Sequence, residues 1–250
     1  MNDITLAVTA HNEGLMAGPC MKSAEAAVAH ARMAGYSVET IVGLDTPTED
    51  TKSFFGQPHF QNWYSFEFNF GDQGLTRNAM ARAGTGQFLG FLDADDLISE
   101  NWLTRCLECL QQAEAESLEV IVHPELNWQF DGIQNVYAVP QQDDPFFSPH
   151  VMATANYYDA ICTAPRRAWL DHGFPHRDIE NGFALEDYQW FVEMTARGWF
   201  HAVARDTIVF KRRRDNSQSD TARTHRAVIR AIAPLLTDRI HKMAVRDPGR

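Results

Sequence analysis

The segment FLGFLDADDLI, residues 88–98, joins an apolar run directly to a group of carboxylates. The apolar run predicts a buried strand. Asp93, Asp95 and Asp96 follow it, with only Ala94 among them. Like charges this close repel one another unless a positive group lies between them. The segment therefore predicts a strand end that carries a cationic partner.

A divalent cation is one partner that would suit these carboxylates. Mg²⁺ and Mn²⁺ are held by one or two carboxylates together with the phosphates of a substrate. Asp93 and Asp95, with the spacing D-x-D, could supply them. The same residues are also typical of an acidic turn in which Asp96 caps the next helix. A motif this short does not decide between the two interpretations.

Strands and helices alternate along the chain. Apolar runs predict strands over 4–10, 37–45, 87–93, 118–126, 135–140 and 200–214. Helices are expected over 15–35, 73–86, 99–116 with Ser99 as the N-cap, 184–198, and from 221 onward, while 46–51 and 146–177 are expected to be irregular. Alternation of this kind predicts an α/β fold with a mostly parallel sheet covered on both faces. Ligands then bind beyond the carboxyl ends of the strands.

Composition excludes several classes of protein. The 250 residues are 44% hydrophobic and 22% charged, which is ordinary for a globular protein. A formal net charge of -11 argues against nucleic acid as a partner. The first residues do not resemble a signal peptide, and no stretch approaches the roughly 20 apolar residues of a membrane span, so a cytoplasmic protein is expected. Cys106 and Cys109 have no second cysteine pair at zinc-ligand spacing. We therefore expect them to lie on a helix and to pack into the protein core.

Four segments resemble, in order, the family 2 glycosyltransferases. They are ITLAVTAHNE (4–13), VETIVGLDTPTEDT (38–51), GLTRNAMARAGTGQFLGFLDADD (74–96) and ALEDYQWFVEMTARG (184–198). The resemblance extends over 4–219 and implies the nucleotide-sugar-binding GT-A fold. It divides the chain into a transferase domain, 1–220, and a tail, 221–250. Within the domain, a nucleotide-binding half ends near 98 and an acceptor-binding half follows.

The resemblance also implies roles for single residues on the donor side. Asp95 would ligate Mn²⁺ or Mg²⁺, and Asp93 would face the ribose and the water shell of the same metal. Asp45 matches the aspartate that contacts the base, although the loop after it departs from the family pattern D-D-G-S-x-D. The other residues expected to bind the nucleotide are Thr9, His11, Glu13 and Arg77.

Two further elements of the family have counterparts here. Glu186 and Asp187 match its E-D element, so Asp187 is the expected general base and Glu186 would orient it or the acceptor. Two acids at the start of a helix are also typical of a dipole effect alone. The segment FKRRRDNSQS, 210–219, resembles Y-R-x-H-x-x-S-x-S, which places Arg212, Arg214 and Ser217 over the diphosphate, with Ser219 at the last serine.

The expected function is inverting, metal-dependent transfer of a sugar from a nucleotide-sugar donor, with uridine favoured by the resemblance. The acceptor would be a hydroxyl of a glycan or of a lipid-linked sugar. One alternative is a catalytically silent nucleotide- or sugar-binding partner in an assembly. A nucleotidyltransferase is less consistent with the sequence, because TAHNEG is not a Gly-rich phosphate loop. The basic amphipathic tail could contact the inner face of a membrane or form a homodimer.

Overall fold

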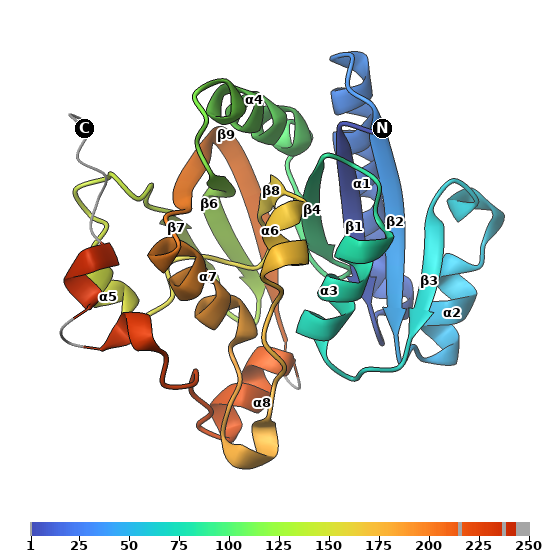
Figure 1. Ribbon diagram of the computed structural model, residues 1–250. Helices are drawn as coiled ribbons and strands as arrows, with labels where there is room; N and C mark the ends of the chain where they lie inside the picture. Colours follow the sequence, from blue (N-terminus) through green and yellow to red (C-terminus); the bar gives the residue numbers. More distant parts are fainter. Residues whose placement is uncertain (1, 215–216, 237–238, 244–250) are drawn as a thin grey trace.

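In the described part of the chain, nine strands form a single sheet. The structure is a computed structural model, and it describes residues 2–214, 217–236 and 239–243. The strand order is β3-β2-β1-β4-β8-β6-β9-β5, with β7 on the edge of β6 (Figure 1). The longest pairings, β1 with β2 and β4 and β6 with β9, are parallel, which confirms the predicted α/β fold. No helix among the described residues is long and apolar enough to cross a membrane.

The strands are β1 Ile4–Ala10, β2 Val38–Asp45, β3 Tyr64–Phe68, β4 Phe88–Asp93, β5 Leu97–Ile98, β6 Val120–Asp131, β7 Asn135–Ala138, β8 Thr163–Pro165 and β9 Phe200–Arg213. The α-helices are α1 Ala17–Met33, α2 Glu49–Phe55, α3 Gln73–Ala83, α4 Trp102–Ala115, α5 Pro149–Met152, α6 Arg167–Asp171, α7 Glu186–Ala196 and α8 Gln218–Thr224.

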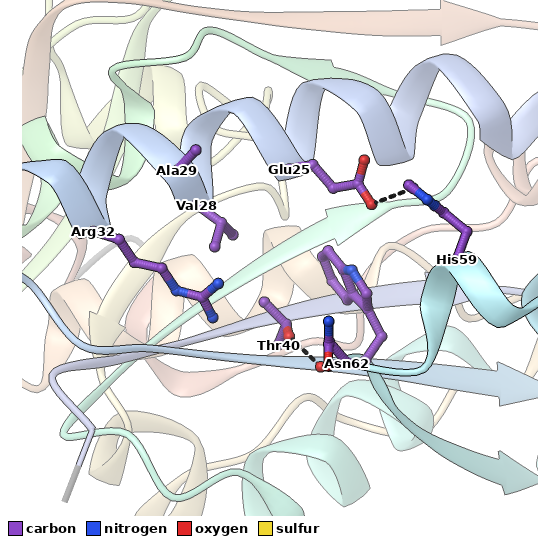
Figure 2. A pocket seen from close by; sticks show the side chains of 8 residues that line it. Glu25, Val28, Ala29, Arg32, Thr40, His59 and Asn62 are labelled. Carbon is purple, nitrogen blue, oxygen red and sulfur yellow. Dashed lines mark hydrogen bonds and ion pairs between the residues drawn. The ribbon is translucent and has the colours of Figure 1, made fainter.

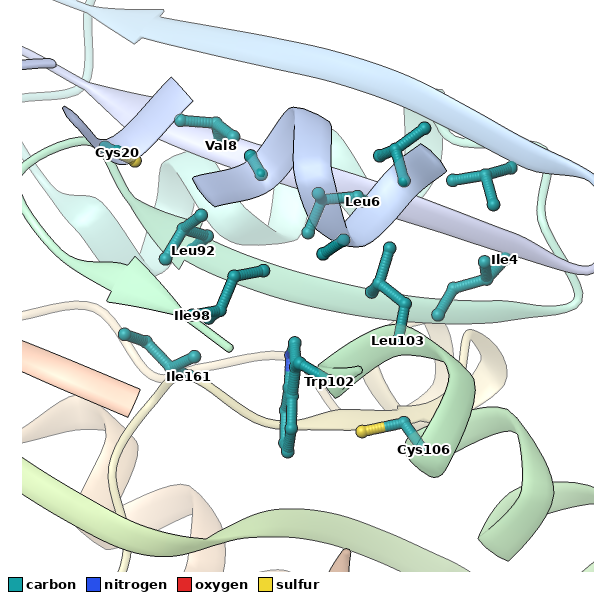
Figure 3. Close-up of a cluster of buried hydrophobic side chains, with 14 of the residues drawn as sticks. Ile4, Leu6, Val8, Cys20, Leu92, Ile98, Trp102, Leu103, Cys106 and Ile161 are labelled. Atoms are coloured by element: carbon teal, nitrogen blue, oxygen red, sulfur yellow. The ribbon is translucent and has the colours of Figure 1, made fainter. Parts of the chain in front are cut away.

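Two apolar layers enclose the sheet. Every residue of β1 is buried, as expected for a central strand that is covered on both faces. On one face, Leu6 and Leu92 pack with α1 and α4, and Trp102 reaches the same cluster (Figure 3). On the other face, Phe91 packs with α3, α6 and α7 through residues such as Trp190. Figure 1 shows α3 and α6 in front of the sheet and α1 behind it. The two layers fix the sheet, so its carboxyl edge is held in place.

The cysteine pair lies where core packing was predicted. Cys106 is 0% exposed and belongs to the apolar cluster around α1 and α4, and Cys109 packs against it. All four cysteines are free thiols. Cys106 and Cys109 therefore serve the core of the fold.

Several expected element boundaries were wrong. Ser99 does not cap α4; Asn101 precedes that helix, and Ser99 Oγ instead accepts a hydrogen bond from Ile208 N. Residues 49–51, expected in a loop, begin α2, because Thr48 caps it through Thr51 N. Among its described residues the tail is helical only to Thr224, and 225–236 and 239–243 are irregular chain with short 3₁₀ turns. The end of the tail, 244–250, lies outside the described residues, so its expected role in membrane contact or dimerisation stays a prediction.

Candidate active site

The carboxyl ends of β2, β1 and β4 lie side by side, because the three strands are parallel neighbours. Thr9 pairs with Asp93 in register, and Thr9 Oγ1 donates a hydrogen bond to Asp93 Oδ1 at 2.9 Å. The predicted meeting of these strand ends is confirmed. We call the group of acids that follows the three strands the carboxylate edge; its members are Glu13, Asp45, Asp93, Asp95 and Asp96.

Asp93 is buried and bonded on both carboxylate oxygens. Its Oδ1 accepts hydrogen bonds from Gln73 Nε2 at 2.6 Å and from Arg77 Nη2 at 2.5 Å, as well as from Thr9. Its Oδ2 lies 2.9 Å from Lys211 Nζ. Burial alone would raise the pKa of Asp93, but Arg77 and Lys211 hold that pKa well below its usual range. Asp93 is therefore ionised and paired with the protein's own cations.

Arg77 connects the carboxylate edge to α7. Its side chain is 2% exposed, and its Nη1 lies 4.0 Å from Glu186 Oε1, while its Nη2 contacts Asp93. The residue lies on α3, whose N-terminus is capped by Asp72 through a hydrogen bond from Leu75 N. A single buried guanidinium thus faces both the expected donor side and the expected catalytic pair.

Lys211, on β9, is the cation that lies among the crowded carboxylates. Its Nζ lies 2.8 Å from Asp96 Oδ2, 2.9 Å from Asp93 Oδ2 and 3.2 Å from Asp159 Oδ1. Although burial lowers the pKa of a lysine, the three carboxylates raise the pKa of Lys211 well above its usual range. A side chain from the far end of the chain therefore relieves much of the repulsion that DADD would otherwise carry.

Lys211, Asp96 and Asp159 were not predicted from the sequence as site residues. Lys211 follows the buried Val209 by two positions, so the alternation of β9 could have indicated that both face the protein. Asp96 was considered only as a helix cap, although it is 0% exposed. Nothing in the local sequence marks Asp159, because only the topology brings it to Lys211.

Asp95 is paired with Arg214. Asp95 Oδ2 lies 3.0 Å from Arg214 Nε, and Arg214 Nη2 lies 2.7 Å from Glu13 Oε1. The second oxygen of Glu13 accepts a hydrogen bond from His11 N at 2.6 Å. Burial, and then the nearby charge of Asp93, raise the pKa of Asp95. Among the described residues Asp95 Oδ1 has no partner, so this oxygen remains open to a ligand.

The donor atoms at this edge fit a cation held by a single carboxylate. In the described ranges, no group of three or more His, Cys, Asp or Glu side chains is arranged to hold a metal ion. Mg²⁺ and Mn²⁺ need only one or two protein carboxylates when phosphates supply the other ligands. Asp95 offers one open oxygen, whereas both oxygens of Asp93 already accept from protein donors. These contacts favour Asp95 over Asp93, which was predicted as a second ligand.

Asp45 organises the loop that follows β3. Its Oδ1 accepts hydrogen bonds from Phe70 N at 2.7 Å and Gly71 N at 3.2 Å, and its Oδ2 accepts one from Asp72 N at 3.0 Å. His11 Nδ1 lies 2.8 Å from the carbonyl oxygen of Asp45. Asp45, expected to contact the base, and His11, expected to bind the nucleotide, are therefore adjacent. Asp45 Oδ2 keeps one lone pair with which it can accept a further hydrogen bond.

Glu186 and Asp187 form the first turn of α7. Leu185, just before them, has a φ of 64°, a left-handed conformation that is uncommon for a branched residue and that often marks a functional turn. Gly74 on α3 allows close packing here, since a Cβ at that position would lie 2.9 Å from Glu186 Cγ. Burial raises the pKa of Asp187 to about 7, with the Glu186 carboxylate adding to the shift. A carboxylate with such a pKa is suited to accept a proton near neutral pH.

The residues expected over the diphosphate lie in different places. Arg214 is at the carboxylate edge, whereas Arg212 points to β6, where its Nη1 lies 2.5 Å from Asp131 Oδ2. The backbone N of Arg212 donates to Asp96 Oδ1 at 2.7 Å, so the residue also secures the turn after β4. Ser217 caps α8 by accepting a hydrogen bond from Asp220 N. The side chain of Ser219 lies outside the described residues.

A separate cavity of about 160 Å³ lies between α1, β2 and the 3₁₀ turn Pro58–Phe60. Figure 2 shows Arg32, Thr40 and His59 around it, with His59 paired to Glu25. Thr40 lies near the amino end of β2, whereas Asp45 ends that strand. The cavity is therefore distinct from the carboxylate edge.

Residues 5–130 match the family model of glycosyl transferase family 2, which covers half of the chain. The chain belongs to glycosyl transferase family 2. The matched segment includes Asp45, Arg77, Asp93 and Asp95, whereas Glu186 and Asp187 lie outside it. No curated protein sequence matches the chain.

Solved structures share the fold of this family 2 member. S. aureus TarS 1-349, in complex with UDP-GlcNAc, aligns with a TM-score of 0.63 at 16% identity, over 86% of this chain and 60% of that one. The mannosyltransferase PcManGT from Pyrobaculum calidifontis, in complex with GDP-Man and Mn²⁺, aligns with a TM-score of 0.59 at 13% identity, over 97% of this chain and 69% of that one. At these identities the likeness establishes the GT-A fold alone. The chain spans about 60% of the length of the TarS structure.

Proposed function

We propose that this family 2 member transfers a sugar, with inversion, from a nucleoside-diphosphate sugar to a hydroxyl of a glycan or lipid-linked acceptor. The donor we expect is a UDP-sugar carrying a hexose or an N-acetylhexosamine. The observation that carries the proposal is the position of Arg77, which contacts Asp93 on one side and faces Glu186 on the other. Through Arg77, the nucleotide side and the acidic pair of α7 belong to one site.

The carboxylate edge is proposed to bind the donor. Asp45 and His11 would contact the base, and Thr9, Glu13, Arg77 and Asp93 would line the ribose and diphosphate. Asp95 would hold Mn²⁺ or Mg²⁺, as the Mn²⁺ complex of PcManGT supports. Such an ion, when bound, stabilises the negative charge that develops on the leaving diphosphate. Arg214, which already lies at Asp95, adds a fixed positive charge for the same purpose.

Asp187 is proposed as the general base. Inverting transfer needs a group that takes the proton of the acceptor hydroxyl on the face opposite the leaving group. A carboxylate whose pKa is raised to about 7 is a stronger base than an ordinary one and is still largely ionised at mildly alkaline pH. Glu186, held between Arg77 and Arg177, would keep the base and acceptor in position.

The test combines binding with product detection. Wild-type protein is titrated with UDP in the presence and absence of Mn²⁺ by calorimetry, and nucleotide sugars are then screened for release of UDP. We expect Mn²⁺-dependent UDP binding, and an Asp187→Asn variant that binds UDP normally but does not turn over. Glu108→Gln is the control, because it also removes one carboxylate from a helix, and Glu108 pairs with Arg105 at the surface of α4. Normal turnover by Asp187→Asn would refute the assigned base. Binding without any turnover of the wild-type protein would favour the silent binding partner.

A further inference from the structure

Arg214 holds two acids of the carboxylate edge with one guanidinium. Its Nε lies 3.0 Å from Asp95 Oδ2, and its Nη2 lies 2.7 Å from Glu13 Oε1. Glu13 is 8% exposed and is fixed from its other oxygen by His11 N. The contact from Nη2 to Glu13 is a charge-assisted hydrogen bond, whereas the contact from Nε to Asp95 is an ion pair without hydrogen-bond geometry. The guanidinium is therefore anchored on Glu13 by a hydrogen bond and pairs with Asp95 through charge.

The same contact conflicts with a cation at Asp95. A divalent ion ligated by this carboxylate would lie within a few ångströms of the guanidinium, and two cations at that separation repel each other. With Arg214 in place, the trio of Glu13, Asp95 and Arg214 has a net charge of about −1, and a divalent ion alone would turn it to about +1. A diphosphate would reverse that excess, because it brings at least two negative charges. Arg214 then has a better partner in the phosphate than in Asp95.

Lys211 cannot take over this role. Its Nζ is already shared by Asp93, Asp96 and Asp159, and among the described residues it forms no ion pair with Asp95. Arg212 pairs with Asp131 through Nη1, and its Nε donates a hydrogen bond to the backbone oxygen of Asp95 rather than to the carboxylate. Of the three cations, only Arg214 is positioned to exchange one anionic partner for another.

We propose that Arg214 occupies the place beside Asp95 until a nucleoside diphosphate arrives, and that it then moves its guanidinium to the phosphate. This inference rests on the proposed function. Its consequence is that the cation and the diphosphate bind as a unit, while the free cation binds weakly. A residue that only contacted phosphate would not have this effect, because it would leave the affinity for free Mn²⁺ unchanged.

The experiment measures Mn²⁺ binding without nucleotide, by loss of the free-ion signal in electron paramagnetic resonance, and UDP binding at saturating Mn²⁺ by calorimetry. For Arg214→Ala we expect the two affinities to change in opposite directions. The affinity for Mn²⁺ alone rises about tenfold, since the competing positive charge beside Asp95 is lost, and the affinity for UDP with Mn²⁺ falls by a similar factor. Arg214→Lys, which keeps the charge but cannot span both acids, should lie between. Arg213→Ala is the matched control, because it removes the same charge from the adjacent position.

The outcomes separate the two proposals. If Arg214→Ala binds Mn²⁺ alone no better than wild type, including the case in which neither binds detectably, the inference is overturned. If wild-type protein does not bind UDP even with Mn²⁺, the proposed function fails, and the Mn²⁺ titration still reports on Arg214. Circular dichroism and the melting temperature establish that each variant is folded. Arg214→Gln replaces the alanine variant if the latter does not fold.

Discussion

Lys211 Nζ donates a hydrogen bond to Asp93 Oδ2 at 2.9 Å across 118 positions of sequence. The contact joins the end of β4 to the end of β9, and the same ammonium reaches Asp96 and Asp159. The acids after β4 therefore stabilise the fold, in addition to forming the proposed ligand site. Their neutralisation by lysine leads to the first prediction.

Lys211→Met should destabilise the protein by about 3 kcal/mol, because it leaves buried carboxylates without their cation. Methionine keeps much of the length and volume of the lysine side chain, so lost packing contributes little. The free energy of unfolding is measured by urea denaturation at pH 7. Lys52→Met serves as the control, since Lys52 forms a pair with Glu67 at the surface, and little or no change in stability is expected there. Equal effects of the two variants would contradict the structural role of Lys211.

The rate of transfer should rise with pH through about 7 and then level off. Burial raises the pKa of Asp187 to about 7, and the base acts only when it is deprotonated, so activity is lost on the acid side. Glu186→Gln removes a negative charge that helps to raise this pKa, and it should move the acid limb to lower pH. The profile of kcat/KM against pH tests both statements. An acid limb that stays in place in the glutamine variant would argue against the coupling of the two carboxylates.

Gly74→Ala should lower transfer about tenfold or more while the fold is retained. A Cβ at this position would lie 2.9 Å from Glu186 Cγ and 3.1 Å from Phe174 Cβ, so Glu186 must shift. Gly18→Ala in α1 is the control, because nothing lies within 4 Å of the added Cβ. Alanine should there stabilise the helix by about 0.5–1 kcal/mol and leave turnover unchanged. The two variants are compared by melting temperature and by release of UDP, and equal turnover would contradict the predicted displacement.

Acid should weaken the fold through a buried histidine pair. His123 Nε2 lies 2.8 Å from His201 Nδ1, and both rings stack on Tyr158. Burial lowers the pKa of His201 from 6.5 to about 3 and lowers that of His123 as well. Below pH 6.5 these histidines bind protons in the unfolded chain but stay neutral in the folded chain. The free energy of unfolding therefore falls as the pH drops from about 6.5 toward 3, by up to about 1.4 kcal/mol per pH unit for each histidine.

The measurement is urea denaturation at several pH values for wild type and His201→Gln. The variant should show a shallower dependence on pH in this window. His59→Gln, at the surface, should leave the slope as it is. If the slope of His201→Gln equals that of wild type, the pair does not carry the effect.

The sequence predicted the strands best where burial and periodicity agree. β1 extends over Ile4–Ala10 as expected, because a continuous apolar run has no other place in an α/β fold. The sequence predicted poorly the segments whose structure depends on turns. Ser99 resembles a helix cap but accepts a hydrogen bond from β9, and the helix of the tail ends at Thr224. Local sequence patterns do not show which distant segments of the chain will contact each other.

The same limit applies to the site. Asp93, Asp95, Arg77 and Asp187 could be proposed from motifs in the sequence. No motif marks Lys211 or Asp159, because their importance comes from contacts between segments that are far apart, and the alternation of β9 indicates only that Lys211 faces the protein. The contact between Arg214 and Asp95 is of the same kind.

The pairing of Lys211 with the acids after β4 also bears on how the protein is made. The acids of DADD, residues 93–96, are synthesised long before Lys211. A nascent or truncated chain that ends before residue 211 therefore lacks the ammonium group that pairs with them. The amino-terminal half alone thus lacks the cation that neutralises these acids, and the turn after β4 gains that cation only after β9 has been synthesised and has paired with β6.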